Sequence, residues 1–132
     1  MPAIRALPSL LPPTMLTLYG IPNCDTVKKA RAALDEAGRA HVFHDFKKQG
    51  VPEDRLDAWL RELGWQALVN TRGTTWRKLD VAQRDAVTDA ASARALMLAR
   101  PSVIRRPVVE QDGTVVGAGM DAVQGLLAAA GG

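Results

Sequence analysis

The chain contains a single cysteine, Cys24, and its position predicts a reactive thiolate. Cys24 follows a short apolar segment and a Gly-Ile-Pro-Asn turn at 20–23, and it begins an amphipathic stretch. A thiolate at a helix N-terminus faces unpaired backbone N–H groups and the positive end of the helix dipole, which both favour the charged, nucleophilic form. The alternative is a small buried hydrophobic residue, the commoner role of a lone cysteine. The coincidence of strand end, turn and helix start favours the reactive thiol.

The residues that follow Cys24 determine what partner chemistry it needs. The negative charge of Asp25 destabilises the Cys24 thiolate. Lys28 and Lys29, one turn further on, offset this effect if their side chains reach back to the sulfur. The sequence Cys-Asp-Thr-Val lacks the second thiol of a Cys-x-x-Cys motif. A mixed disulfide on Cys24 must therefore be resolved by a thiol from solution or from another protein. Glutathione is the simplest candidate, as a co-substrate and not as a bound cofactor.

Two segments rich in basic residues are candidate anion sites. Arg105 and Arg106 precede Pro107, and Arg72 lies with Arg77 and Lys78 in the polar segment 70–78. An arginine fork suits carboxylates and oxyanions because it donates paired hydrogen bonds. Solvated surface side chains are the alternative in both segments. In the polar segment, Arg72 is the residue that we expect to bind an anion.

The two histidines do not suggest a metal site. His41 and His44 are three residues apart on a predicted strand, so their side chains face opposite sides of it. The sequence also contains no Cys/His cluster, so we expect no metal.

Apolar periodicity predicts the elements that position these residues. Val27, Ala30 and Leu34 recur at helical spacing, and Asp112-Gly113 suits a two-residue hairpin turn. The predicted elements are a strand at 15–19, a helix at 24–37, a strand at 40–46, a turn at 47–50, a helix from 52 to 63, a loop at 70–78, helices after 80 and at 92–99, hairpin strands at 106–111 and 114–118, and a helix from about 121.

This order predicts an α/β fold with a thioredoxin-like mixed sheet covered on both faces. A helical insertion at about 53–100 separates the strand-helix-strand unit from the hairpin and the last helix, and residues 15–132 form one domain. In such a sheet the loop before the hairpin lies beside the first helix, and the peptide bond before Pro107 is typically cis. Residues 1–14 hold four of the eight prolines and are expected to form a flexible arm, or to precede a natural start at Met15.

Composition narrows the class of protein. The 132 residues are 47% hydrophobic and 23% charged, with a formal net charge of +3 and no basic stripe, which argues against direct binding of nucleic acid. No apolar run approaches the roughly 20 residues that span a membrane. One cysteine permits no internal disulfide, so we expect a soluble cytoplasmic protein.

Five separated blocks carry a resemblance to a known family. The sequence resembles the arsenate reductase (ArsC) family of thioredoxin-like proteins, and in particular its YffB and Spx-like branch. The blocks are MLTLYGIPNCDTVKKAR at 15–31, HDFKK at 44–48, LGW at 63–65, NTRGTTWRKL at 70–79 and IRRPV at 104–108.

The resemblance implies a mechanism and two site residues. In the glutathione- and glutaredoxin-coupled members, the cysteine attacks arsenate, glutathione forms a mixed adduct and glutaredoxin completes the reduction. Cys24 matches this nucleophile, and Arg106 matches the arginine that precedes the family's cis-proline, here Pro107.

The sequence also departs from the arsenate reductases. They carry a histidine four residues before the cysteine and a serine three residues after it, where this chain has Gly20 and Val27. Their first anion-binding arginine aligns with Asn70, which leaves Arg72 as a shifted substitute. Their last one falls at 117–119, where this chain has no arginine.

The predicted function is therefore a glutathione-dependent monothiol reductase. Cys24 attacks an oxidised thiol or an oxyanion, and Arg106, Arg72, Pro107 and Lys28 form the site for a small anionic substrate or for glutathione. Glutaredoxin is a candidate partner. The alternative is an Spx-like regulator that binds the RNA polymerase α subunit, and a narrower alternative is a true arsenate reductase.

Overall fold

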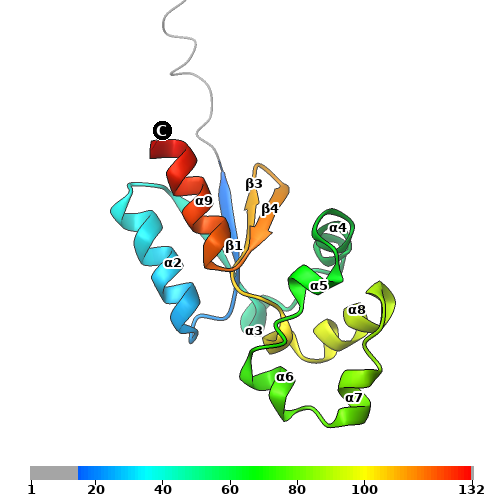
Figure 1. Cartoon of the computed structure of the whole chain (residues 1–132). Coiled ribbons are helices and arrows are strands. Elements are labelled where there is room, and N and C mark those ends of the chain that lie inside the picture. Colours follow the sequence, from blue (N-terminus) through cyan, green and yellow to red (C-terminus); the bar gives the residue numbers. More distant parts are fainter. Residues whose placement is uncertain (1–14, 132) are drawn as a thin grey trace, which may run out of the picture.

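A computed structural model describes residues 15–131 of the chain (Figure 1). The predicted N-terminal arm, 1–14, lies outside the described residues. The helices and strands follow in the order β1 (Leu16–Gly20), α2 (Asp25–Glu36), β2 (His41–Asp45), α3 (Phe46–Gln49), α4 (Glu53–Leu63), α5 (Trp65–Leu68), α6 (Thr74–Lys78), α7 (Val81–Asp85), α8 (Ala90–Ala99), the 3₁₀ turn η1 (Pro101–Val103), β3 (Val108–Gln111), β4 (Thr114–Ala118) and α9 (Met120–Gly131).

The strands form a mixed sheet in the order β2-β1-β3-β4. Strand β1 pairs in parallel with β2 and antiparallel with β3, so that Leu18 lies between Phe43 and Val109. Strands β3 and β4 form the predicted hairpin around Asp112-Gly113. The predicted thioredoxin-like mixed sheet is confirmed.

Side chains alternate across the sheet and build a core on each face. Leu16 and Leu18 are fully buried on one face, with Leu34 of α2 and Val123 of α9. Helices α2 and α9 pack side by side on this face (Figure 1). Tyr19 contributes to the second core, which is formed with side chains of α3, α4, α5, α6, α8 and η1. Each fully buried leucine contributes about 1.5–3 kcal/mol relative to an exposed one.

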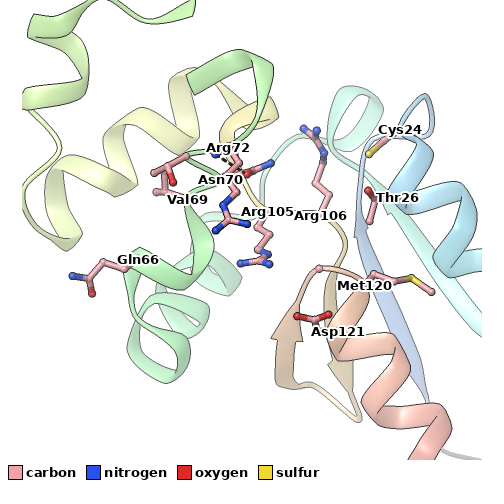
Figure 2. Close-up of a pocket in the computed structure, with 12 residues that line it drawn as sticks. Cys24, Thr26, Gln66, Val69, Asn70, Arg72, Arg105, Arg106, Met120 and Asp121 are labelled. Carbon is pink, nitrogen blue, oxygen red and sulfur yellow. Dashed lines mark hydrogen bonds between the residues drawn. The ribbon is translucent and has the colours of Figure 1, made fainter. Parts of the chain in front are cut away.

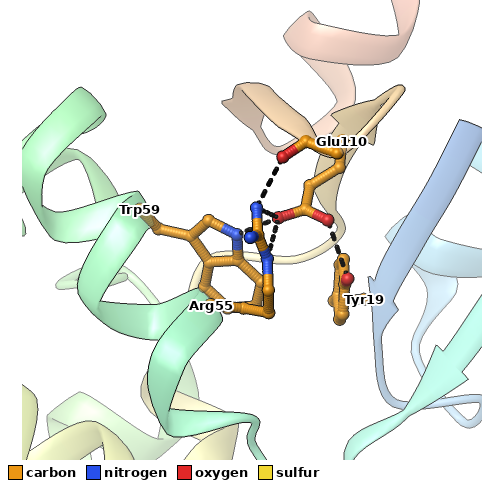
Figure 3. A network of polar contacts seen from close by, with 5 residues as sticks. Tyr19, Arg55, Trp59 and Glu110 are labelled. Atoms are coloured by element: carbon orange, nitrogen blue, oxygen red, sulfur yellow. Dashed lines mark hydrogen bonds and ion pairs between the residues drawn. The ribbon is translucent and has the colours of Figure 1, made fainter.

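A buried carboxylate joins the helices of the second core to the sheet (Figure 3). Glu110 of β3 is 3% exposed and accepts a 2.8 Å hydrogen bond from the Tyr19 hydroxyl of β1. Its other oxygen accepts from Arg55 Nε and Trp59 Nε1 of α4, both at 2.8 Å. Burial, and then the hydrogen bond to the Glu110 carboxylate, raise the pKa of Tyr19 well above its usual range. Tyr19 therefore stays protonated and keeps donating to Glu110.

The segment predicted as a loop at 70–78 contains the short helix α6 at its end. No side chain caps α6, because its N-cap residue is Gly73. The helix forms because Trp76 packs against the second core and the following Leu79 is buried. Packing therefore overrides a weak local helix signal in this segment.

Three further boundaries differ from the prediction. The predicted turn at 47–50 is largely taken up by the one-turn helix α3, because the Asp45 carboxylate accepts a 2.8 Å hydrogen bond from the Lys47 N–H and caps it. Helix α5 was not predicted. Strand β3 begins at Val108 and not at 106, and the backbone of Ile104 and Arg105 before it pairs instead with Leu68 and Val69.

No helix within residues 15–131 is both long enough and apolar enough to cross a membrane.

Replacing Glu110 tests whether this carboxylate holds the two layers together. Glu110→Gln removes the charge that Arg55 pairs with, and breaking a mostly buried pair of this kind is expected to lower the free energy of unfolding by roughly 2–4 kcal/mol. Urea unfolding at pH 7 measures the loss. Glu53→Gln, which removes an exposed partner of Arg94, is the matched control and should leave the urea midpoint unchanged. Equal losses in both variants would show that Glu110 has no special role.

Candidate active site

Cys24 lies where the sequence predicted it, at the N-cap of α2. Its backbone is extended, with φ −138° and ψ 124°, and its carbonyl accepts the first helical hydrogen bond, 2.9 Å from the Lys28 N–H. The thiol is partly exposed, has no disulfide partner and makes no side-chain capping bond. The N-terminus of a 12-residue helix favours negative charge on this sulfur. Asp25, in the first turn, opposes that effect.

A pocket of about 480 Å³ opens beside Cys24 (Figure 2). Ligand pockets commonly enclose about 300–1,000 Å³. Its wall is formed by four segments that lie far apart in the sequence. They are the start of α2 with Cys24 and Thr26, the stretch from α5 to α6 with Gln66 and 69–72, the loop before β3 with Arg105 and Arg106, and the start of α9 with 119–121.

Backbone pairing brings the second and third segments together. Val69 and Ile104 form an isolated antiparallel bridge, and the Arg105 N–H donates a 2.7 Å hydrogen bond to the Leu68 carbonyl. The Asn70 N–H donates to the Val103 carbonyl at 2.8 Å. Arg72 and Arg105 consequently point into the same space in Figure 2.

Three guanidinium groups line the pocket, and none of them pairs with an acidic side chain among the described residues. Within residues 15–131, the side chains of Arg72 and Arg105 form no hydrogen bond and no ion pair. Arg106 Nη1 donates to the Ser102 carbonyl at 2.7 Å, while its Nε is buried and has no partner in the described part of the chain. Arginine donors in this state suit a carboxylate or another oxyanion.

The structure brings together three of the residues predicted for the site and separates two. Cys24, Arg72 and Arg106 line one pocket. The peptide bond before Pro107 is cis, as predicted, and Pro107 lies behind Arg106 without lining the pocket. Lys28 is exposed on α2 and does not line the pocket either.

Sequence reasoning did not select Arg105 over Arg106, and it missed Asp121. Arg105 lies against Gly119, where a Cβ atom would come within 2.9 Å of Arg105 Nε. Gly119 also has a φ of +91°, which favours glycine. Gly119, just after the predicted hairpin, was the signal in the sequence, because a glycine leaves room for a long side chain such as that of Arg105. Asp121 follows in the first turn of α9 and lines the same pocket.

The histidines lie apart from this site. His44 Nε2 is 2.8 Å from the Gly50 carbonyl, and its ring packs against Tyr19 with centroids 4.9 Å apart. His41 Nδ1 lies 3.3 Å from the Arg39 carbonyl. Within the described residues, no group of three or more His, Cys, Asp or Glu side chains is placed to hold a metal ion.

Comparison with known proteins identifies the family. The sequence profile of the ArsC family matches residues 19–125, a stretch that includes Cys24 and all three arginines. The chain belongs to the ArsC family. The predicted YffB branch is also represented, because a YffB protein of known structure is 49% identical, has a TM-score of 0.75, and covers 85% of this chain and 98% of its own.

Two further similar proteins are named after a reductase and a regulator. An arsenate reductase (ArsC) related protein from Brucella melitensis is 49% identical, with a TM-score of 0.66 and coverage of 79% of this chain and 86% of its own. A global transcriptional regulator Spx from Listeria innocua is 30% identical over 97 residues, 72% of each protein. Membership of the family supports a thiol-dependent reductase or an Spx-like regulator.

Gly20 and Val27, which replace the histidine and serine of the arsenate reductases, are packed against each other. A Cβ atom at Gly20 would lie 2.9 Å from Cγ2 of Val27, which is only 1% exposed. Because valine is stiff at χ1 and fully enclosed here, it cannot rotate away. A histidine at position 20 would therefore require a different residue at 27, and the two departures from the arsenate reductase pattern belong together.

This packing predicts opposite outcomes for two glycine substitutions. Gly20→Ala is expected to lower the free energy of unfolding by roughly 1–3 kcal/mol because it overpacks the space beside Val27. Adding Val27→Ala should remove the clash, so that the double variant loses less than the sum of the two single changes. Gly125→Ala is the control, since Gly125 lies in α9 with open space around it, and it should gain about 0.5–1 kcal/mol. Additive losses in the double variant in urea unfolding would contradict the proposed contact.

Proposed function

We propose that this protein is a glutathione-dependent monothiol reductase in which Cys24 attacks an oxidised thiol. The observation that carries the proposal is the free thiol at the start of α2, which lines a pocket together with three guanidinium groups that pair with no acid among the described residues. The chain contains no second cysteine to resolve an intermediate. The reducing equivalents must therefore come from an external thiol compound. Three arginines line the pocket, which suits the negatively charged carboxylates of glutathione.

The chemistry consists of two thiol-disulfide exchanges. The Cys24 thiolate attacks the glutathione sulfur of a mixed disulfide, forms a Cys24–glutathione disulfide and expels the substrate thiolate, which takes a proton from solvent. The thiolate of a second glutathione then attacks the glutathione sulfur on Cys24. This step releases oxidised glutathione and regenerates the Cys24 thiolate. The sum is one disulfide substrate and one glutathione converted to one reduced thiol and one oxidised glutathione.

The arginines bind the carboxylates of glutathione in this scheme. Glutathione carries two carboxylates. Arg72 in the helical insertion and Arg106 in the loop before β3 both offer planar, charged donors to them. Pro107 fixes the backbone that presents Arg106, since its carbonyl accepts a 2.8 Å hydrogen bond from the Gly119 N–H. Lys28, which is exposed one turn from Cys24, contributes its positive charge without contacting the ligand.

The proposal places the protein in the cytosol, where glutathione is kept reduced. Glutaredoxin is a second thiol donor that fits the same step, because it can reduce the Cys24–glutathione disulfide from outside the pocket. Arsenate is the less favoured substrate because Gly20 and Val27 leave the site without the histidine and serine of the arsenate reductases.

Incubation with oxidised glutathione tests the proposal. Mass spectrometry should detect one glutathione adduct on the wild-type chain and none on Cys24→Ser. Arg72→Ala and Arg106→Ala should each slow adduct formation about tenfold, since a hydrogen bond to a charged group is worth roughly 1.5–3 kcal/mol.

Arg77→Ala is the matched control for charge, because Arg77 is exposed on α6 and does not line the pocket. It should react at nearly the wild-type rate. An unmodified Cys24 would refute the reductase, and equal slowing by all three arginine variants would refute the assigned anion site.

The Listeria relative supports a second candidate, an Spx-like regulator. In that case the chain binds the C-terminal domain of the RNA polymerase α subunit, and Cys24 acts only as a sensor. A pull-down with this domain distinguishes the two candidates. The reductase predicts no capture, whereas capture that persists in Cys24→Ala would favour the regulator.

A further inference from the structure

The pocket is lined by one acidic side chain, Asp121, which has no part in the proposed chemistry. Asp121 lies in the first turn of α9 and lines the pocket together with Arg105. Among the described residues, the Asp121 carboxylate forms no ion pair, although three guanidinium groups line the same cavity. Opposite charges that share a pocket without neutralising each other remain available to a ligand that carries both.

Arg105 is held in place opposite this acid. Its backbone N–H is bonded to the Leu68 carbonyl, and its side chain lies across Gly119, two residues before Asp121. Figure 2 shows the Asp121 carboxylate on the α9 side of the pocket, with the Arg105 and Arg72 guanidinium groups across from it. The two charges come from separate backbone segments that are each fixed by hydrogen bonds, because the Gly119 N–H is bonded to the Pro107 carbonyl.

We propose that Arg105 and Asp121 form a subsite for an α-amino acid group, in which Arg105 joins Arg72 in binding the carboxylate and Asp121 binds the ammonium. This inference rests on the proposed function and identifies the part of the substrate that is recognised. In glutathione, the group with this chemistry is the γ-glutamyl end, where a carboxylate and an ammonium share one carbon. The substrate class is thus narrowed to disulfides that carry a free amino acid end.

The alternative explanation of Asp121 is purely structural. An acidic residue in the first turn of a helix interacts favourably with the helix dipole, whatever lies in front of it. The two explanations differ in one respect. A subsite depends on the ammonium of the ligand, whereas the interaction with the dipole does not.

Two disulfides, one with this ammonium and one in which it is acetylated, separate the explanations, because the bulk of the acetyl group is the same for every protein variant. Oxidised glutathione has the free α-ammonium, and the disulfide of N-acetylglutathione has lost it while keeping both carboxylates. The readout is the rate constant for Cys24 adduct formation with oxidised glutathione divided by the rate constant with the N-acetylated disulfide. Using a ratio cancels any general change in thiolate reactivity or in the fraction of folded protein.

Asp121→Asn is expected to lower this ratio about fivefold, because it removes one charge-assisted contact at an exposed site. Arg105→Ala should slow both disulfides to a similar degree, since both retain the carboxylate. Asp25→Asn is the matched control, because Asp25 is an exposed acid next to Cys24 that does not line the pocket. It should change both rates together and leave the ratio unchanged.

The outcomes distinguish the subsite from the reductase itself. A wild-type chain that forms no adduct with either disulfide refutes the proposed function. A wild-type chain that forms the adduct, together with an Asp121→Asn variant whose ratio stays at the wild-type value, refutes only the subsite. A ratio that falls equally in Asp25→Asn would also overturn it, because the effect would then come from any acid near Cys24.

Discussion

The Glu110 carboxylate is nearly fully buried and binds side chains from both layers of the fold. It accepts a hydrogen bond from Tyr19 in the sheet, and from Arg55 and Trp59 in the first helix of the insertion. A buried charge is costly unless it is paired and fully hydrogen-bonded, and here three partners meet that requirement at one point. The orientation of α4 against the sheet therefore depends on this contact.

The pocket lies between the same two layers, so its geometry depends on how they are joined. Backbone pairing of Val69 with Ile104 is the second connection, and it carries Arg72 to the loop that bears Arg105 and Arg106. Cys24 is fixed separately, by the strand and helix of the sheet layer. The thiol and its proposed anion site are thus held by different parts of the fold and meet only because the insertion is anchored.

The parts of this arrangement that depend on local sequence could be predicted. The position of Cys24 at a strand-turn-helix junction follows from apolar periodicity and a Gly-Ile-Pro-Asn turn, and both signals lie within a few residues of Cys24 in the sequence. Helix α6 could not be predicted in this way, because it has no capping side chain and is stabilised by the packing of Trp76 and Leu79 against distant segments. The contribution of Arg105 depends on Gly119 and on pairing with Leu68, which are contacts between distant segments.

The central claim is that Cys24, Arg72 and Arg106 form one glutathione site, and a chemical-shift titration tests it most directly. Reduced glutathione is added to the Cys24→Ser protein, in which no disulfide can form, while the backbone amides and the arginine Nε–Hε signals are followed. We predict that the signals of Arg72, Arg106 and the substituted position 24 move together along one binding curve. Shifts confined to exposed lysines, or curves that differ between the insertion and α2, would contradict it.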